Sequence, residues 1–391
     1  MQSITARSAF SFPMLVSGFV AVLVGYSSSA AIIFQAAQAA GASPTQIGGW
    51  LSMLGIAMGL CSLGLSLWTR MPILCAWSTP GAALLATSLQ GLSINEAVGV
   101  FIFANALIVL SGVTGLFARL MKVIPPALAS AMLAGILLRF GLEAFTGLQN
   151  DSALCGAMLL SGLLARRWLA RYAILATLAV GIAVALARHE IHFPAQIASF
   201  ALPQGIVPHF SLTALLGVGL PFFLVTMASQ NAPGIATLQA HGYQPPVSAL
   251  MSWTGLVALL LSPFGGFSVC IAAITAAICM GDEVDPDPRR CWMAAALAGL
   301  FYLLAGLSGA LIAALFVALP SPLIATLAGL ALLSTFSGSL TRALAQPDTR
   351  DTAAITFLIT ASGLSLSGIG AAFWGLVGGV VAHAVLTRRA P

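Results

Sequence analysis

The stretch Pro72-Ile-Leu-Cys-Ala-Trp-Ser-Thr-Pro-Gly81 lies between two long apolar runs, and it is poorly suited to a regular helix. Pro80 has no backbone N–H and clashes with the preceding turn, and Gly81 is conformationally free, so this pair stops or restarts a helix. In a membrane chain, an apolar run interrupted in this way is typical of a segment that is half extended and half helical and that lines a binding site.

The composition predicts that lipid surrounds this stretch. Of the 391 residues, 59% are hydrophobic and only 6% are charged, whereas a soluble domain carries about 25% charged residues. The net charge of +5 comes from basic residues in short loops, so it reports membrane topology rather than a nucleic-acid partner. We therefore expect an all-α, polytopic membrane protein with the lipid bilayer as its partner and no nucleic acid.

Apolar runs between charges and Pro/Gly clusters predict about fourteen transmembrane segments. Their spans are 13–40, 46–69, 72–90, 95–119, 126–146, 153–169, 172–187, 211–240, 246–263, 265–280, 291–318, 322–345, 352–367 and 368–387. The third and tenth runs are short for a bilayer, which asks for about 20 residues in a straight helix. If all runs cross and the N-terminus is cytoplasmic, every Lys and Arg except Arg139 and Arg188 falls on the cytoplasmic side. Both termini are then cytoplasmic.

The two halves of the chain, residues 1–195 and 205–391, are predicted to be repeats of seven segments each. Two pairs of stretches are similar in sequence, 126–138 with 320–332 and 38–44 with 239–245. Pro72 and Pro263 also correspond, and all three pairs occur in the same order in each half. Because seven is odd, the second repeat enters the membrane from the opposite face, which makes the repeats inverted.

Two polar clusters are the candidate binding residues. The partner of the opening stretch is Pro263-Phe-Gly-Gly-Phe-Ser268 and the apolar residues after it, and the other cluster is formed by amides of the eighth run and hydroxyls of the first. The predicted binding residues are Trp77, Ser78, Thr79, Gly81, Tyr26, Ser28, Gln230, Asn231, Phe267 and Ser268. Two half-helices that point their N-termini at one another would favour an anion. The alternatives are kinked structural helices and helix–helix hydrogen bonding.

Few ionisable groups lie within the apolar runs. Arg139 and Glu143 are four residues apart and would face each other on a helix. They form either a structural ion pair or, through Glu143, the membrane carboxylate for proton coupling. No zinc helix, nucleophile elbow or phosphate loop appears, so we expect no enzyme activity, no cofactor and no metal.

Several strings resemble the bacterial benzoate:proton symporter family. They include Ala76-Trp-Ser-Thr-Pro-Gly-Ala-Ala-Leu-Leu85, Ser229-Gln-Asn-Ala-Pro-Gly-Ile235, Ala272-Ala-Ile-Thr-Ala-Ala-Ile-Cys279 and Gly370-Ala-Ala-Phe-Trp-Gly375. The likeness covers essentially the whole chain. The family is related to nucleobase and sulfate-permease-like carriers, which share a seven-plus-seven inverted-repeat fold.

The resemblance implies a secondary active transporter of the bacterial inner membrane. It would import benzoate or a similar aromatic carboxylate with protons, by alternating access. A core domain (13–119 plus 211–318) would hold substrate between the third and tenth segments, against a gate domain (126–187 plus 322–387) that is often dimeric in the wider fold, so a homodimer is one implied arrangement. Nucleobase carriers place carboxylates in segments eight and ten, where this chain has Gln230, Asn231 and Ser268. The absence of acids suits an anionic substrate.

Three other functions stay open at the level of sequence. The same fold could carry another small anion or a nucleobase, or the chain could form an uncoupled anion channel. An intramembrane enzyme is the third alternative, and the lack of a catalytic motif argues against it.

Overall fold

The computed structural model describes residues 11–115, 125–192, 203–280, 283–367 and 369–386. Within them, eight helices are long and apolar enough to cross a membrane, so the chain is a helical multi-pass membrane protein, as the composition predicts. They are α1 (Phe12–Ala39), α2 (Pro44–Thr69), α4 (Ile94–Val113), α6 (Pro126–Asn150), the helical stretches Leu212–Ala240, Val247–Phe264 and Pro288–Leu307, and α16 (Ser321–Ala343).

Outside the two broken runs, 72–90 and 265–280, the remaining elements are shorter helices. They are α7 (Ser152–Trp168), η1 (Ala170–Tyr172), α8 (Ala173–Ala187), α15 (Gly309–Ala318), η6 (Pro347–Thr349), α17 (Arg350–Ala361) and α18 (Ala371–Leu386). The stretch Val247–Phe264 comprises α12 (Val247–Leu261) and η4 (Ser262–Phe264), and Pro288–Leu307 comprises η5 (Pro288–Arg290) and α14 (Trp292–Leu307).

Part of the predicted topology concerns residues that the structure does not describe. Arg7, Arg119, Lys122, Arg388 and Arg389, which carry much of the predicted orientation, lie outside the described residues, as does most of the predicted junction of the two halves between residues 195 and 205. The count of fourteen segments and the orientation of the termini therefore stay predictions.

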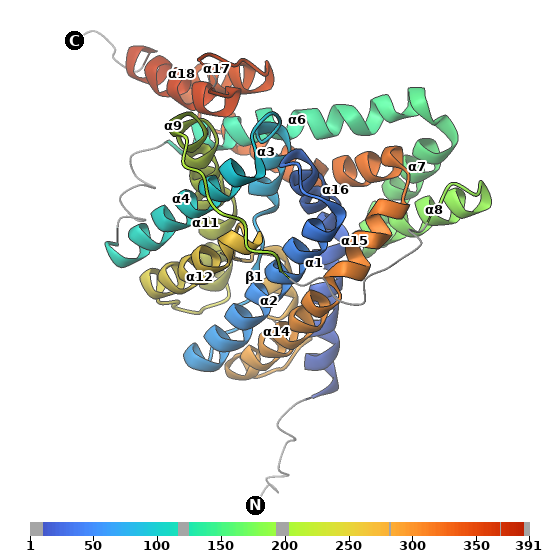
Figure 1. Cartoon of the computed structure of the whole chain (residues 1–391). Helices are drawn as coiled ribbons and strands as arrows, with labels where there is room; N and C mark the ends of the chain where they lie inside the picture. Colours follow the sequence, from blue (N-terminus) through green and yellow to red (C-terminus); the bar gives the residue numbers. More distant parts are fainter. Residues whose placement is uncertain (1–10, 116–124, 193–202, 281–282, 368, 387–391) are drawn as a thin grey trace, which may run out of the picture.

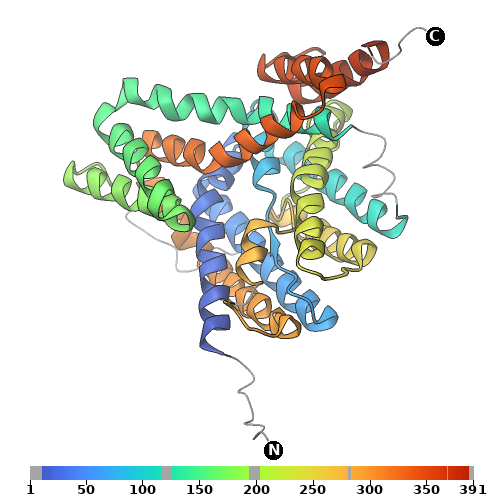
Figure 2. The same ribbon diagram turned by 180° about the vertical axis from the view of Figure 1, so that it is seen from behind.

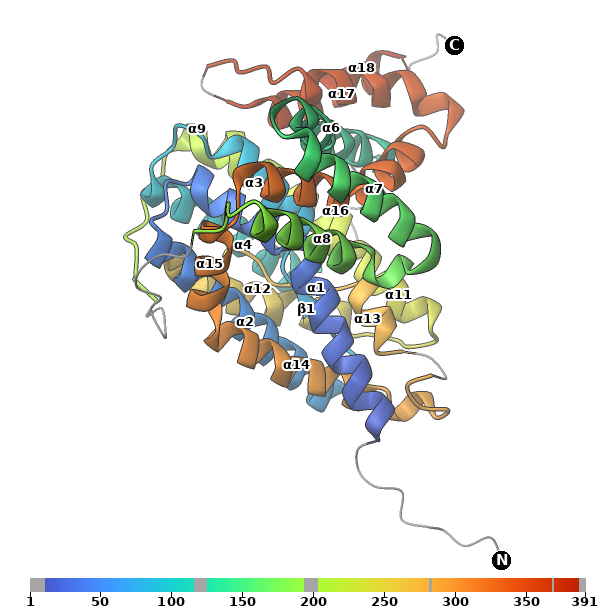
Figure 3. The ribbon, with the colours of Figure 1, turned by 90° about the vertical axis from the view of Figure 1, so that its right-hand side faces the viewer.

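The helices pack in two groups. In the first group, α14 and α15 pack on α2, α12 packs on α4, and α1 packs on α14. In the second group, α16 and α17 pack on α6, α7 packs on α8, and α17 packs on α18. Figures 1 and 3 show the second group on one side of the molecule and α2, α12 and α14 on the other, and Figure 2 shows α6 and α16 running together. Contacts of α1 with α16 and α8 join the groups.

A two-stranded sheet lies inside the first group. Strand β1 (Cys75–Ala76) pairs antiparallel with β2 (Cys270–Ile271), and Cys75 lies opposite Ile271. Each strand precedes a short helix, α3 (Thr79–Ser88) after β1 and α13 (Ile274–Ile278) after β2. The predicted runs 72–90 and 265–280 are thus half extended and half helical, as expected. The second half-helix is much shorter, five residues against ten.

A corner after α6, outside the predicted membrane-spanning runs, fixes the far end of that helix. Asp151 caps α7 by accepting the Leu154 N–H at 3.0 Å, and Arg188 after α8 donates to both Asp151 oxygens at 2.7 and 2.8 Å. Burial raises the pKa of Asp151, but these hydrogen bonds outweigh it and hold that pKa below its ordinary value. The helices α6, α7 and α8 are therefore tied together at one point.

Small residues allow α2 and α14 to approach closely. A Cβ added at Gly306 on α14 would lie 2.7 Å from the Ile56 N and 2.9 Å from the Ser52 O, both backbone atoms of α2. Helices in a membrane associate largely through such close packing, because lipid provides no hydrophobic force between them.

We predict that Gly306→Ala destabilises the protein by about 1–3 kcal/mol, because its methyl group must displace the α2 backbone. Thermal unfolding in detergent measures this as a lower Tm. Gly64→Ala on α2 is the matched control, since no heavy atom lies within 4 Å of a Cβ there. An unchanged Tm for Gly306→Ala would show that the two helices are not in close contact.

Candidate functional site

Side chains from neighbouring helices satisfy the backbone of the strand pair. Ser62 Oγ accepts the Cys75 N–H at 2.9 Å, and Ser66 Oγ donates to the Ile73 carbonyl at 2.9 Å. On the β2 side, Asn231 Oδ1 accepts the Ile271 N–H at 2.9 Å. An unpaired backbone group at this depth costs several kcal/mol. Sequence reasoning did not single out Ser62 and Ser66, because a serine in an apolar helix carries no distinctive signal.

The predicted residues Ser78 and Ser268 meet at the start of α3. The Ser78 N–H donates to Ser268 Oγ at 2.9 Å, and Ser78 Oγ caps α3 by accepting the Gly81 N–H at 3.0 Å. Thr226 Oγ1 adds a contact of 3.2 Å to Ser78 Oγ. A Cβ at Gly81 would lie 2.5 Å from the Phe222 ring, which explains the glycine. Ser78 and Ser268 are fully buried, so in this conformation they hold the broken segments together.

The three predicted aromatic residues, Tyr26, Trp77 and Phe267, occupy two different places. Trp77 Nε1 donates to Ser29 Oγ at 2.7 Å, and the Trp77 ring meets the Tyr26 ring edge-on at 4.7 Å. Phe267 is fully buried in a cluster with three other rings, Trp50, Phe101 and Phe222. The ring of Phe267 is therefore part of the packed interior here.

The eighth run changes its helical pitch at the predicted amide pair. It consists of α9 (Leu212–Ala214), the π-turn η2 (Leu215–Gly219), α10 (Leu220–Thr226), the π-turn η3 (Met227–Asn231) and α11 (Ala232–Ala240). A proline follows each π-turn, Pro221 and Pro233, and the carbonyl four residues before each lies within the turn. Proline has no N–H to donate to that carbonyl, and its ring clashes with it. The wider π-turn accommodates the proline within the helix.

The predicted binding residues fall into two sets by their solvent exposure. Trp77, Ser78, Gly81, Asn231, Phe267 and Ser268 are buried, whereas Tyr26, Ser28, Thr79 and Gln230 are partly exposed. The hydroxyl of Tyr26 is itself buried and has no hydrogen-bond partner among the described residues. Such an atom is unusual in a native fold and marks a position where a ligand or water can bind.

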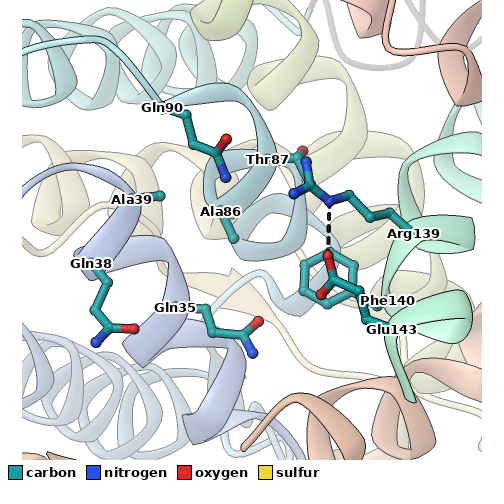
Figure 4. A pocket seen from close by; sticks show the side chains of 9 residues that line it. All are labelled: Gln35, Gln38, Ala39, Ala86, Thr87, Gln90, Arg139, Phe140 and Glu143. Atoms are coloured by element: carbon teal, nitrogen blue, oxygen red, sulfur yellow. Dashed lines mark hydrogen bonds and ion pairs between the residues drawn. The ribbon is translucent and has the colours of Figure 1, made fainter. Parts of the chain in front are cut away.

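A polar pocket of about 310 Å³ lies between α1, α3 and α6 (Figure 4). Its lining is Gln35, Gln38, Ala39, Ala86, Thr87, Gln90, Arg139, Phe140 and Glu143. Arg139 Nε donates to Glu143 Oε1 at 2.9 Å, so the two side chains face each other as their spacing predicts. They are 56% and 41% exposed, so the ion pair contributes little to stability.

The pocket and the partly exposed residues share helix faces. Ser28 and Gln35 are seven residues apart on α1, and Thr79 and Ala86 are seven apart on α3. Residues seven apart lie on one face of a helix, two turns or about 10 Å along its axis. The pocket therefore lies on the same faces of α1 and α3 as Ser28 and Thr79, about two turns further along each helix.

Solved membrane transporters share this fold. The transmembrane domain of the cyanobacterial bicarbonate transporter BicA matches with a TM-score of 0.60 at 14% identity, over 96% of each chain. SLC26A9 matches with a TM-score of 0.64 at 14% identity, over 95% of this chain and 65% of that chain. The chain thus has the fold of these solved membrane proteins, with the broken segments at its centre.

Sequence relatives give the family. The inner membrane protein YdcO of Escherichia coli (strain K12) is 58% identical over 374 residues, covering 96% of both chains. The benzoate membrane transport protein of Acinetobacter baylyi is 36% identical over 384 residues, covering 98% of both. The family described as benzoate membrane transport protein matches residues 8–385. This chain belongs to that family, as its strings predict, and is a membrane transport protein.

We predict that Asn105→Ala destabilises the protein by about 1–3 kcal/mol, because it leaves a buried carbonyl unpaired. Asn105 is fully buried on α4, and its Nδ2 donates to the Phe267 carbonyl at 2.9 Å and to Ser262 Oγ at 3.0 Å. Thermal unfolding in detergent measures the loss. Asn150→Ala at the exposed end of α6 is the control, and equal Tm values for the two variants would contradict the role of Asn105.

Proposed function

We propose that this protein imports benzoate or a similar aromatic carboxylate across the bacterial inner membrane, together with protons. The assignment of the substrate rests on the family match along nearly the whole chain and on a relative named as a benzoate membrane transport protein. The location is supported by the relative named as an inner membrane protein. In this proposal both termini are cytoplasmic.

The proposed binding site lies where the two broken segments meet. The carboxylate would lie near the start of α3, whose positive end favours an anion, within reach of Thr79, Gln230 and the unpaired Tyr26 hydroxyl. The ring would pack against the Tyr26–Trp77 pair. The predicted residues of this region include no carboxylate, so nothing there repels an anion. Ser78, Asn231, Phe267 and Ser268 would hold the broken segments in place.

Alternating access would move the two helix groups against one another. We assign the first group as the core (13–119 plus 211–318) and the second as the gate (126–187 plus 322–387), with a homodimer joined through the gate. The packing supports an inverted repeat of fourteen segments. The contact of α2 with α14 is matched by that of α12 with α4, and α7 with α8 by α17 with α18. The predicted repeat maps α2 onto α12 and α4 onto α14, and it maps α7 and α8 onto α17 and α18. Each contact therefore has its counterpart in the other repeat.

We predict saturable uptake of labelled benzoate into proteoliposomes that carry an inward proton gradient, and loss of accumulation when a protonophore collapses the gradient. Gln230→Leu removes a polar contact to the carboxylate and raises the KM about tenfold, if that contact is worth about 1.5 kcal/mol. Gln149→Leu, exposed at the end of α6, is the control and leaves the KM unchanged.

Folded protein that gives no uptake above empty liposomes would refute the proposal. Flux that does not saturate and ignores the pH gradient would identify an uncoupled anion channel instead. A panel of competing compounds separates aromatic carboxylates from other small anions and nucleobases.

A further inference from the structure

The pocket between α1, α3 and α6 holds a cation, Arg139, that gives only one of its donor groups to another described residue. Arg139 gives its Nε–H to Glu143, and its two terminal nitrogens have no partner among the described residues. A guanidinium presents five donors in a planar fork that matches the two oxygens of a carboxylate. In Figure 4 the Arg139 side chain extends from α6 toward α3, and Gln35 and Gln90 point toward the same space. Their amides can add donors to an anion bound there.

The charges of the pocket balance in its present state. Arg139 and Glu143 are the charged residues in its lining. Other elements that pack on α6 carry charged or titratable groups on α7 (Arg166, Arg167), α16 (Arg342), α17 (Arg350, Asp351) and α18 (His383), and none of these residues lines the pocket. The helices α1 and α3 also end here, and helix C-termini carry partial negative charge. A carboxylate added beside an ionised Glu143 would thus meet net repulsion.

An apolar hollow adjoins the polar pocket. It has a volume of about 390 Å³, shares Gln35 and Gln38 with the polar pocket, and is otherwise lined mainly by apolar side chains that include Phe34, Phe316 and Ile324. A charged anchor next to apolar surface suits a small amphipathic anion, with its carboxylate at the anchor and its ring over the apolar side.

We propose that the Arg139–Glu143 pocket is a second carboxylate-binding site, which takes up the anion and one proton together. This proposal rests on the proposed function and adds a second binding site to it. The proton binds a Glu143 carboxylate oxygen, the Glu143–Arg139 ion pair opens, and the freed guanidinium binds the substrate carboxylate through two hydrogen bonds. From this site the anion reaches Ser28 and Thr79 along the shared faces of α1 and α3.

Proton and anion stabilise each other in this site by charge alone. Protonation removes the negative charge of Glu143, so the positive charge of Arg139 can offset the partial negative charges of the helix C-termini and favour the anion, and the bound anion in turn favours the protonated form of Glu143. This coupling is reciprocal: the proton raises the affinity for the anion by the same factor as the anion raises the affinity for the proton. Above pH 5.5 a substrate carboxyl with an ordinary pKa of about 4 stays ionised. A change in benzoate affinity with pH above this value therefore comes from the protein.

The test measures benzoate binding and uptake by the full-length protein between pH 5.5 and 8. The wild type binds benzoate more tightly as pH falls. Glu143→Gln mimics the protonated state, so it binds benzoate with a pH-independent affinity, exchanges benzoate across the membrane and no longer accumulates it on a proton gradient. Arg139→Gln weakens binding about tenfold or more, and Arg139→Lys, which keeps the charge without the fork, lies between.

Matched controls are Arg342→Gln at the end of α16 and Glu283→Gln in an exposed loop, which keep wild-type affinity and pH dependence. If the wild type neither binds nor transports benzoate, the proposed function itself fails. If the wild type does transport it, but Glu143→Gln keeps the full pH dependence or both Arg139 variants keep wild-type affinity, this second site is refuted and the proposed function stands. Size-exclusion profiles confirm that each variant is folded, and the conservative Arg139→Lys keeps the test available if Arg139→Gln does not fold.

Discussion

The pairing of β1 with β2 is the interaction on which the rest of the structure depends. Extended backbone inside a bilayer is tolerated only when every polar group finds a partner in the protein. The strands supply part of that pairing to each other, and Ser62, Ser66 and Asn231 supply more. Because Ser78 and Ser268 join the start of α3 to the segment of β2, the site is built from two distant parts of the chain that cannot form without each other.

The surrounding helices are shaped to permit this centre. Glycines such as Gly81 and Gly306 allow backbones and rings to approach closely, and the π-turn before Pro233 brings the Asn231 side chain against β2. Among the predicted binding residues, those left partly exposed are Tyr26, Ser28, Thr79 and Gln230. A transporter needs this combination, since a fixed frame around a small set of available polar groups can bind a substrate without losing its own hydrogen bonds.

Much of this was predictable from the sequence, and the remainder was not for physical reasons. Pro72, Pro80 and Pro263 with their glycines mark the broken segments, because no other residues interrupt an apolar run so strongly. The pairing of Arg139 with Glu143 follows from helical spacing. The burial of Phe267 and the partners Ser62, Ser66 and Asn105 depend on which helices meet, and a single sequence holds no signal for that. The same limit applies to the π-turns, which become visible only as a response to Pro221 and Pro233.

We propose that substrate binds where the two broken segments meet. A cryo-EM structure of the protein at saturating benzoate tests this most directly. Density for one benzoate is expected beside Tyr26, Thr79 and Gln230, near the start of α3. Benzoate density confined to other parts of the protein, with this region empty and unchanged, would contradict it.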